Sequence, residues 1–208
     1  SYYTGDFSAE FQKRNGVSTD RVNEVFSRLS SEAIAFQHAF IADNPNPLGS
    51  KHLMDKPAHV ARGEYAEFHA NYHPYFRNFL EKFGYYDIFL VELENGRVVY
   101  SVFKELDYAT SLVDGPYSQS NFAAAFRAVQ GSRNPDLVKM VDFDEYYPSY
   151  QSAASFLSAP IIDGDEPVGV LVFQIPIDQI NITMTNSGSW SSVGLGRSGE
   201  TYMVSNDY

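Results

Sequence analysis

Apolar and polar positions are most clearly patterned between positions 85 and 108, where two segments rich in β-branched and aromatic residues flank one turn. Positions 88–93 and 98–103 are the predicted strands, and Asn95 and Gly96 lie between them. An Asn-Gly pair is typical of a type I′ turn, because both central residues of that turn need a positive φ. The pattern therefore predicts a β-hairpin at the centre of the fold.

A helical pattern precedes the hairpin. Apolar residues recur every three or four positions over 64–83, and Gly84 is well placed to end this helix. Pro74 lies in its middle and predicts a kink or a break, because proline has no backbone N–H to donate. Shorter helical patterns cover most of 1–44, and the Pro-rich stretch 44–63 predicts a long loop.

Three further strands are predicted after the hairpin, at 137–143, 153–162 and 168–175. A helix over 122–129, which Ser120 can cap, separates them from the hairpin, and a last helix starts at Pro176. Neighbouring strands joined by short turns must be antiparallel. The sequence therefore predicts an α+β fold with a five-stranded antiparallel sheet and flanking helices.

Composition narrows the functions that such a fold can serve. The 208 residues carry a formal net charge of −11, which argues against binding nucleic acid or anionic lipid through bulk electrostatics. Cysteine is absent, so disulfides, thiolate nucleophiles and iron–sulfur clusters are excluded. No apolar run reaches 18 residues, so any membrane contact is expected only through segments outside this chain.

Several stretches of the chain have a familiar sequence and order: 44–52, 72–74, 83–107, 115–117, 164–173, 177–180 and 194–204. They resemble the Cache family of bacterial extracytoplasmic sensor domains, which have a PAS-like sheet, and more narrowly its double-Cache receptors. The resemblance implies a helical stalk over 1–83, with the Pro-rich loop at 44–63. It further implies a membrane-distal Cache domain over 84–186. Residues 187–208 are then a linker and the first strand of a membrane-proximal domain.

The resemblance also implies a setting and a role. Such domains form the periplasmic part of inner-membrane receptors of the chemoreceptor, cyclase or histidine kinase type, and homodimerise through their stalk helices. The expected function is sensing a small polar ligand and relaying its binding through the stalk. The sequence departs from the amino-acid-binding members of the family, because their Arg-x-Trp-Tyr motif is missing. The single tryptophan, Trp190, lies in a late Gly/Ser-rich stretch. Amino-acid sensing of that type is therefore not expected.

Candidate ligand-binding residues gather at the end of the second predicted strand and in two aromatic loops. They are Lys104, Asp107, Tyr108, Tyr117, Tyr147, Ser149 and Tyr150. A lysine can hold a carboxylate or phosphate, and tyrosine hydroxyls can orient a small polar ligand in an aromatic pocket. Two alternatives stay open: the charged residues form a surface ion-pair cluster of little energetic weight, or the aromatic loop fills its own pocket.

A pair of histidines in the 64–83 helix is better explained by packing than by metal binding. His69 and His73 share one helix face at the spacing of a two-histidine metal pair, but Ala70 replaces the zincin glutamate and Pro74 follows at once. Polar packing of the helix is the favoured interpretation. No catalytic residue, metal site or cofactor is predicted, and an enzyme is not expected. A second hypothesis for function is a periplasmic protein-interaction module without a small-molecule ligand, docking through the 44–63 loop.

Overall fold

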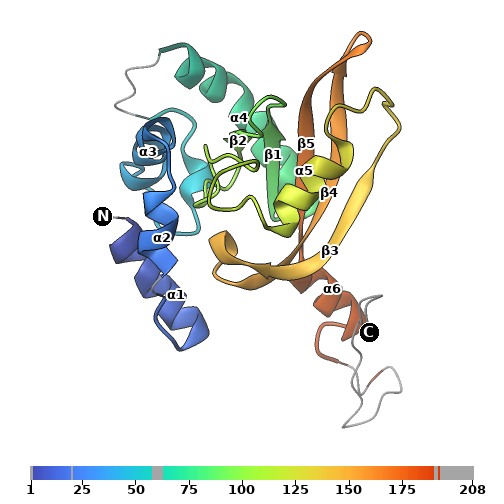
Figure 1. The fold of residues 1–208 in the computed structure, drawn as a ribbon. Helices are drawn as coiled ribbons and strands as arrows, with labels where there is room; N and C mark the ends of the chain where they lie inside the picture. The colour runs from blue at the N-terminus through green and yellow to red at the C-terminus, as the bar shows by residue number, and fades with distance from the viewer. Residues whose placement is uncertain (1, 20, 58–62, 190–191, 193–208) are drawn as a thin grey trace.

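A computed structural model describes residues 2–19, 21–57, 63–189 and 192, and its centre is one antiparallel sheet (Figure 1). The strands lie in the order β2-β1-β5-β4-β3. Their bounds are Asp87–Val91 (β1), Val98–Ser101 (β2), Lys139–Tyr146 (β3), Ser152–Asp163 (β4) and Glu166–Pro176 (β5). All neighbouring pairs are antiparallel. The predicted α+β fold with a five-stranded, PAS-like sheet is confirmed.

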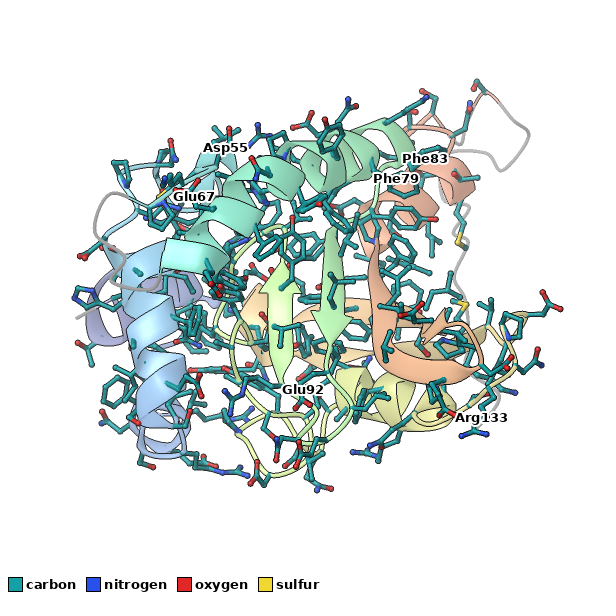
Figure 2. All side chains as sticks on the ribbon, turned by 90° about the horizontal axis from the view of Figure 1, so that it is seen from above. Asp55, Glu67, Phe79, Phe83, Glu92 and Arg133 are labelled. Carbon is teal, nitrogen blue, oxygen red and sulfur yellow. The ribbon has the colours of Figure 1, made fainter. Side chains whose placement is uncertain are left out.

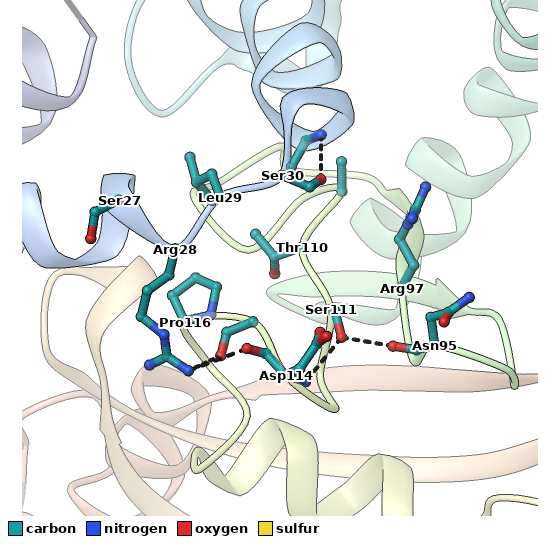
Figure 3. A pocket seen from close by; sticks show the side chains of 13 residues that line it. Ser27, Arg28, Leu29, Ser30, Asn95, Arg97, Thr110, Ser111, Asp114 and Pro116 are labelled. Carbon is teal, nitrogen blue, oxygen red and sulfur yellow. Dashed lines mark hydrogen bonds between the residues drawn. The ribbon is translucent and has the colours of Figure 1, made fainter.

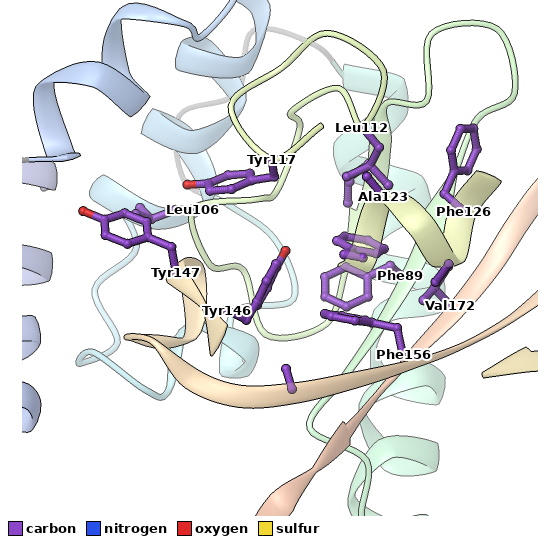
Figure 4. Packing of buried hydrophobic residues seen from close by; sticks show 14 of the residues in the cluster. Phe89, Leu106, Leu112, Tyr117, Ala123, Phe126, Tyr146, Tyr147, Phe156 and Val172 are labelled. Carbon is purple, nitrogen blue, oxygen red and sulfur yellow. The ribbon is translucent and has the colours of Figure 1, made fainter. Parts of the chain in front are cut away.

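Alternation along the strands divides the apolar side chains between two faces of the sheet. In β1, Phe89 and Val91 join one hydrophobic cluster, whereas Ile88 and Leu90 join another. Helix α5 (Asn121–Val129) covers the first face and begins at Ser120, whose side chain accepts the N–H of Ala123, as predicted. Phe89, Phe156 and Val172 of the sheet meet Ala123 and Phe126 of α5 in the core (Figure 4).

The N-terminal helices extend the same core. They are a π-helical turn (Tyr3–Phe7), α1 (Ser8–Asn15), α2 (Arg21–Ser27), α3 (Ser31–Gln37) and a second π-helical turn (His38–Ala42). Phe7, Phe11 and Val25 are at most 3% exposed and belong to the cluster that contains Phe89 of the sheet. In Figure 1 these helices lie at one side of the sheet. Within the described chain, α1 and α2 are thus packed on the region that follows residue 83, and the division at residue 83 stays a prediction.

Helix α4 (Gly63–Phe83) packs on the opposite face of the sheet, where Leu80 joins Ile88 and Tyr100. Figure 2 shows α4 running along the sheet, with Phe79 and Phe83 near its C-terminal end. Of the kink or break predicted at Pro74, the break is wrong, because α4 continues through this residue, and the kink stays a prediction. His69, His73 and Leu80 on the buried side hold the helix against the sheet on both sides of the proline, which offsets the hydrogen bond that Pro74 cannot donate.

The hairpin turn differs from the predicted type I′ turn. Only Gly96 of the central pair has a positive φ, of 60°. The carboxylate of Glu92 accepts the backbone N–H groups of Glu94, Asn95 and Arg97 at 2.7–3.2 Å, so the chain makes a wider loop between β1 and β2. A side chain that satisfies three backbone donors thus overrides the local preference of the Asn-Gly pair.

The remaining described segments are short. The loop that begins at Asn44 contains a 3₁₀ turn (Lys51–Leu53), and α6 (Ile177–Met184) follows β5. Pro160 lies in β4 beyond Ser158, the last position of the β3 pairing, so its missing N–H removes no bond to β3. The strand expected within 194–204 and Trp190 lie outside the described residues. None of the described helices is both long enough and apolar enough to cross a bilayer.

Candidate functional site

Three buried carboxyl groups, those of Asp87, Glu105 and Asp107, lie where β1 and the chain after β2 meet; we call them the acidic cluster. Asp87, the first residue of β1, is fully enclosed. Its Oδ1 accepts the N–H groups of Ile88, Val102 and Phe103 at 2.6–3.0 Å, and its Oδ2 accepts the Ser101 hydroxyl at 2.7 Å. Asp87 therefore fixes the end of β2 against β1.

Lys104 is the buried cation closest in sequence to these groups. Its side chain is 2% exposed, and its ammonium donates to the Ser101 carbonyl. The ammonium also lies 4.8–5.8 Å from the ring centres of Phe40, Tyr100 and Tyr108, within cation–π range. Burial lowers the pKa of Lys104 to about 7, against the opposing effect of the Asp87 carboxylate. A role for Lys104 in holding an anionic ligand stays a prediction.

Glu105 is held by neutral donors. The hydroxyls of Tyr86 and Ser149 each donate to one of its oxygens at 2.8 Å, and Gln174 of β5 donates to Ser149 at 3.0 Å. Burial and the neighbouring charge of Asp107 raise the pKa of Glu105 well above its ordinary value. Hydroxyl donors thus replace water around this carboxyl group without supplying a positive charge.

Asp107 is the least satisfied member of the acidic cluster. Its Oδ2 accepts the Tyr146 hydroxyl at 2.7 Å, but its buried Oδ1 has no hydrogen-bond partner among the described residues. Burial, with the charge of Asp87, raises the pKa of Asp107 to about 7, against the lowering effect of the Tyr146 hydroxyl and of the nearby backbone N–H groups of Asp107 and Tyr108. The Tyr117 hydroxyl is likewise buried without a partner in the described chain. An unpaired buried carboxylate oxygen is costly, so it marks a place where a donor is missing.

Helix α1 and the turn before it cover this region. Phe7 stacks on Tyr150 with ring centres 4.9 Å apart and lies 5.4 Å from Tyr147. The guanidinium group of Arg14 lies 4.3 Å from the centre of the Tyr150 ring. The side chain of Asn15 donates to the Tyr150 carbonyl at 3.0 Å, which ties the end of α1 to the aromatic loop. The predicted aromatic loop is thus a contact surface for the N-terminal helix.

The seven predicted residues fall into two neighbouring groups. Asp107, Tyr117, Tyr147, Ser149 and Tyr150 surround the acidic cluster and the α1 contact. Lys104 and Tyr108 instead face α3 and α4, where the Tyr108 hydroxyl donates to Tyr65 at 2.9 Å.

The prediction omitted Asp87, Tyr86 and Gln174, which bond to this region. Gln174 could have been found, because it is a polar residue within the otherwise apolar positions 168–175.

Three cavities in the described chain have volumes of about 310, 290 and 170 Å³, and none of the seven predicted residues lines them. Asp87 and Glu105 line none of these three cavities either. The 310 Å³ cavity lies at the turn of the hairpin, beside the connection between α2 and α3.

His69 and His73 form a neutral, stacked pair with ring centres 4.3 Å apart. The ring nitrogens of His73 lie 2.7 Å from the Tyr100 hydroxyl and 2.6 Å from the His52 carbonyl. Burial and the charge of Lys104 lower the pKa of His69 to about 3. No group of three or more potential metal ligands occurs among the described residues. The pair anchors the segment around His52 to α4, and the contact of His73 with Tyr100 of β2 is the predicted polar packing of the helix against the sheet.

Comparisons with known proteins give structural neighbours only. No protein-family model matches the chain, and no curated protein matches it. One similar solved structure is the sensor domain of the histidine kinase DctB of V. cholerae, with 15% identity and a TM-score of 0.40, covering 84% of this chain and 59% of that one.

Another similar structure is the ligand-binding domain of the amino acid chemoreceptor PctC of Pseudomonas aeruginosa PAO1 in complex with GABA. It has 12% identity and a TM-score of 0.35, and the match covers 86% of this chain and 65% of that one. The chain thus spans less than two thirds of the length of these structures.

Proposed function

We propose that this chain is the extracytoplasmic ligand-sensing domain of a bacterial transmembrane signalling receptor. The proposed ligand is a small polar molecule with a positively charged amine, bound at the acidic cluster. The observation that carries the proposal is the buried Oδ1 of Asp107, which has no hydrogen-bond partner among the described residues. An ammonium group supplies both the donor and the charge that this oxygen lacks.

The charge balance of the site supports a cationic ligand. The acidic cluster holds three carboxyl groups, and the buried ammonium of Lys104 interacts electrostatically with one of them, Asp87. Asp87 and Lys104 affect each other's pKa, which leaves Glu105 and Asp107 with hydroxyl donors. A buried carboxylate without a positive partner takes up a proton, whereas a bound ammonium favours the ionised form.

The cover of the site links binding to the N-terminal helices. Phe7 of the first turn stacks on Tyr150, and Asn15 at the end of α1 bonds to the same residue. A ligand that reaches Asp107 must therefore separate or rearrange this contact. A ligand biases a receptor only by its different affinity for two arrangements, and here these are α1 packed on the aromatic loop and α1 released from it.

A thermal-shift titration tests the ligand class. We expect 1,4-diaminobutane to raise the melting temperature and its neutral isostere 1,4-butanediol to leave it unchanged. A ligand present at one hundred times its Kd adds about 2.7 kcal/mol to stability. Asp107→Asn should abolish the shift, whereas Asp165→Asn, at an exposed position in the β4–β5 turn, should retain it. Equal shifts with the diamine and the diol, or no shift with either, would contradict the proposal.

The proposal includes a homodimer that forms through the segment 1–83. Exposed aromatic side chains on α4 favour this helix as the contact between the two copies. Five aromatic residues on α4 are 43–74% exposed: Phe68, Tyr72, Tyr75, Phe79 and Phe83. Their spacing of three or four places them along one side of the helix. Light scattering should show a dimer that Tyr75→Lys converts to a monomer with an unchanged fold. A monomeric wild-type protein at millimolar concentration would contradict this part.

A further inference from the structure

A cavity of about 310 Å³ in the described chain lies outside the acidic cluster and is unassigned; we call it the hairpin cavity. Its walls come from three segments that are far apart in the sequence: 27–30 between α2 and α3, 95–97 at the hairpin turn, and 109–116 (Figure 3). A volume near 300 Å³ is at the small end of the range for ligand pockets. The cavity therefore has room for a small molecule.

Arg28 supplies an oriented cation to this cavity. Its Nη2 donates to the carbonyl oxygens of Gly115 at 2.8 Å and Asp114 at 3.3 Å. Its Nε and Nη1 groups make no hydrogen bond to the described residues. Figure 3 shows the side chain reaching across to the loop. Two carbonyl contacts thus fix the guanidinium plane and leave N–H donors available for an acceptor.

The loop that orients Arg28 depends on a close backbone approach. The N–H of Gly115 donates to the Ser111 carbonyl at 3.1 Å. A Cβ atom at Gly115 would lie 2.3 Å from that carbonyl oxygen, so a side chain cannot be accommodated without movement of the backbone. The glycine is therefore required for the turn that presents its own carbonyl to Arg28.

The other charged and polar groups of the cavity determine which charge and which polar groups a ligand can carry. Arg97, on the side opposite Arg28 in Figure 3, pairs with Glu32 and so has a carboxylate partner already. The Asp114 carboxylate and the Asn95 side-chain amide line the cavity and make no hydrogen bond to the described residues. The cavity thus offers one cation with available donors, one carboxylate and one amide.

We propose that the hairpin cavity binds a small monocarboxylate that also carries a hydrogen-bond donor. The carboxylate of the ligand takes the Nε and Nη1 donors of Arg28, and its hydroxyl or amino group donates to Asp114 or to the amide oxygen of Asn95. A dianion is disfavoured, because Asp114 lines the cavity and like charges repel. An occupant would join the α2–α3 connection to the hairpin turn, and so hold the N-terminal helices against the sheet.

The test is a chemical-shift titration of the labelled protein with three matched small molecules: glycolate, acetate and glycolamide. Glycolate carries both groups, acetate lacks the hydroxyl donor, and glycolamide lacks the charge. We expect saturable shifts of the backbone amides of Ser30, Ser111 and Gly115 with glycolate, a Kd several-fold weaker for acetate, and no saturation with glycolamide. Shifts of equal size with glycolamide, or no saturable shift at these amides with glycolate, would overturn the proposal.

Substitutions separate this site from a general charge effect. Arg28→Ala should weaken glycolate binding at least tenfold, and Arg28→Lys should give an intermediate Kd, because lysine keeps the charge and loses the planar donor group. Arg133→Ala removes another exposed arginine, which pairs with Glu166 and does not line the cavity, and should leave the Kd unchanged. An unchanged Kd in Arg28→Ala would overturn the proposal.

A substitution in one proposed site should not affect ligand binding at the other. Asp107→Asn should leave glycolate binding intact, and Arg28→Ala should leave the diamine thermal shift intact. Loss of glycolate binding in Asp107→Asn would contradict the independence of the hairpin cavity.

Discussion

The acidic cluster and the hairpin cavity contrast in charge and in space. The acidic cluster has an unbalanced charge and a buried oxygen without a partner among the described residues, but its residues line none of the three cavities described above. The hairpin cavity has about 310 Å³ of space, and its charged groups nearly balance. An unpaired hydrogen-bonding group and an available volume are therefore two separate indications of a binding site. The first site must rearrange to bind, whereas the second is already formed.

The two sites also differ in their relation to stability. Asp87 and its neighbours lie within the core and hold two strands together, so they contribute to the fold as well as to the proposed ligand site. Arg28 is an exposed residue that bonds to a loop. Substitutions should therefore have large effects on stability in the acidic cluster and small effects in the hairpin cavity.

The largest effect is expected for Asp87→Ala. This change removes the acceptor for three backbone N–H groups and one hydroxyl, all in the interior. Leaving several buried donors unpaired should lower the free energy of unfolding by about 3–5 kcal/mol. Urea denaturation followed by circular dichroism measures the change, with Asp165→Ala as the exposed control. A loss below about 1 kcal/mol would show that Asp87 does not hold the strands.

A pH-dependent effect is expected for Asp107→Asn. The pKa of Asp107 is about 7 in the folded chain, against an ordinary value of 3.8. Between these values the folded state binds the proton and the unfolded state does not, so the wild-type protein loses stability as pH rises from about 4 to 7. Asparagine has no such proton. The stability of Asp107→Asn relative to wild type should therefore rise by about 2–3 kcal/mol from pH 5 to pH 8.

Denaturation at the two pH values measures this change. His69 and His73, whose pKa values lie below the ordinary range, act in the opposite direction below pH 6.5, but they are present in both proteins and cancel in the difference. If the difference in the free energy of unfolding between Asp107→Asn and wild type did not change with pH, burial would not raise the pKa of the Asp107 carboxyl group.

The smallest effect is expected for Arg28→Ala. Arg28 is exposed, and its hydrogen bond to the Asp114 carbonyl lies at the surface, whereas its bond to the Gly115 carbonyl is partly buried. The free energy of unfolding should change by less than about 0.5 kcal/mol. Differential scanning calorimetry at neutral pH measures it. A loss of more than about 2 kcal/mol would identify Arg28 as a structural clamp and remove the contrast between the two sites.

The sheet could be predicted because its signals are local. Five apolar segments with turn residues between them place the strands within a few residues, and Ser120 caps its helix as expected. The two local errors have local causes. The Glu92 carboxylate widens the hairpin turn, and buried contacts carry α4 through Pro74.

The candidate site was only partly predictable, because its contacts join distant positions. Asn15 and Tyr150 are 135 residues apart, and nothing in their local sequence indicates that α1 packs on the aromatic loop. The sequence around Lys104 is typical of a surface ion-pair cluster. In the structure, however, three aromatic rings lie around its ammonium group. Periodicity predicts which side chains face the core, whereas the partner of a buried charge depends on how the elements pack.

The most direct test of the central claim is hydrogen exchange of α1 with and without a saturating amine. The account predicts that 1,4-diaminobutane speeds exchange at the backbone amides of 8–15, because a ligand at Asp107 releases the contact between α1 and Tyr150, while the amides of β4 and β5 stay protected. Saturable binding of the diamine with unchanged exchange throughout 8–15 would contradict the claim that the acidic cluster and the N-terminal helices form one sensing unit.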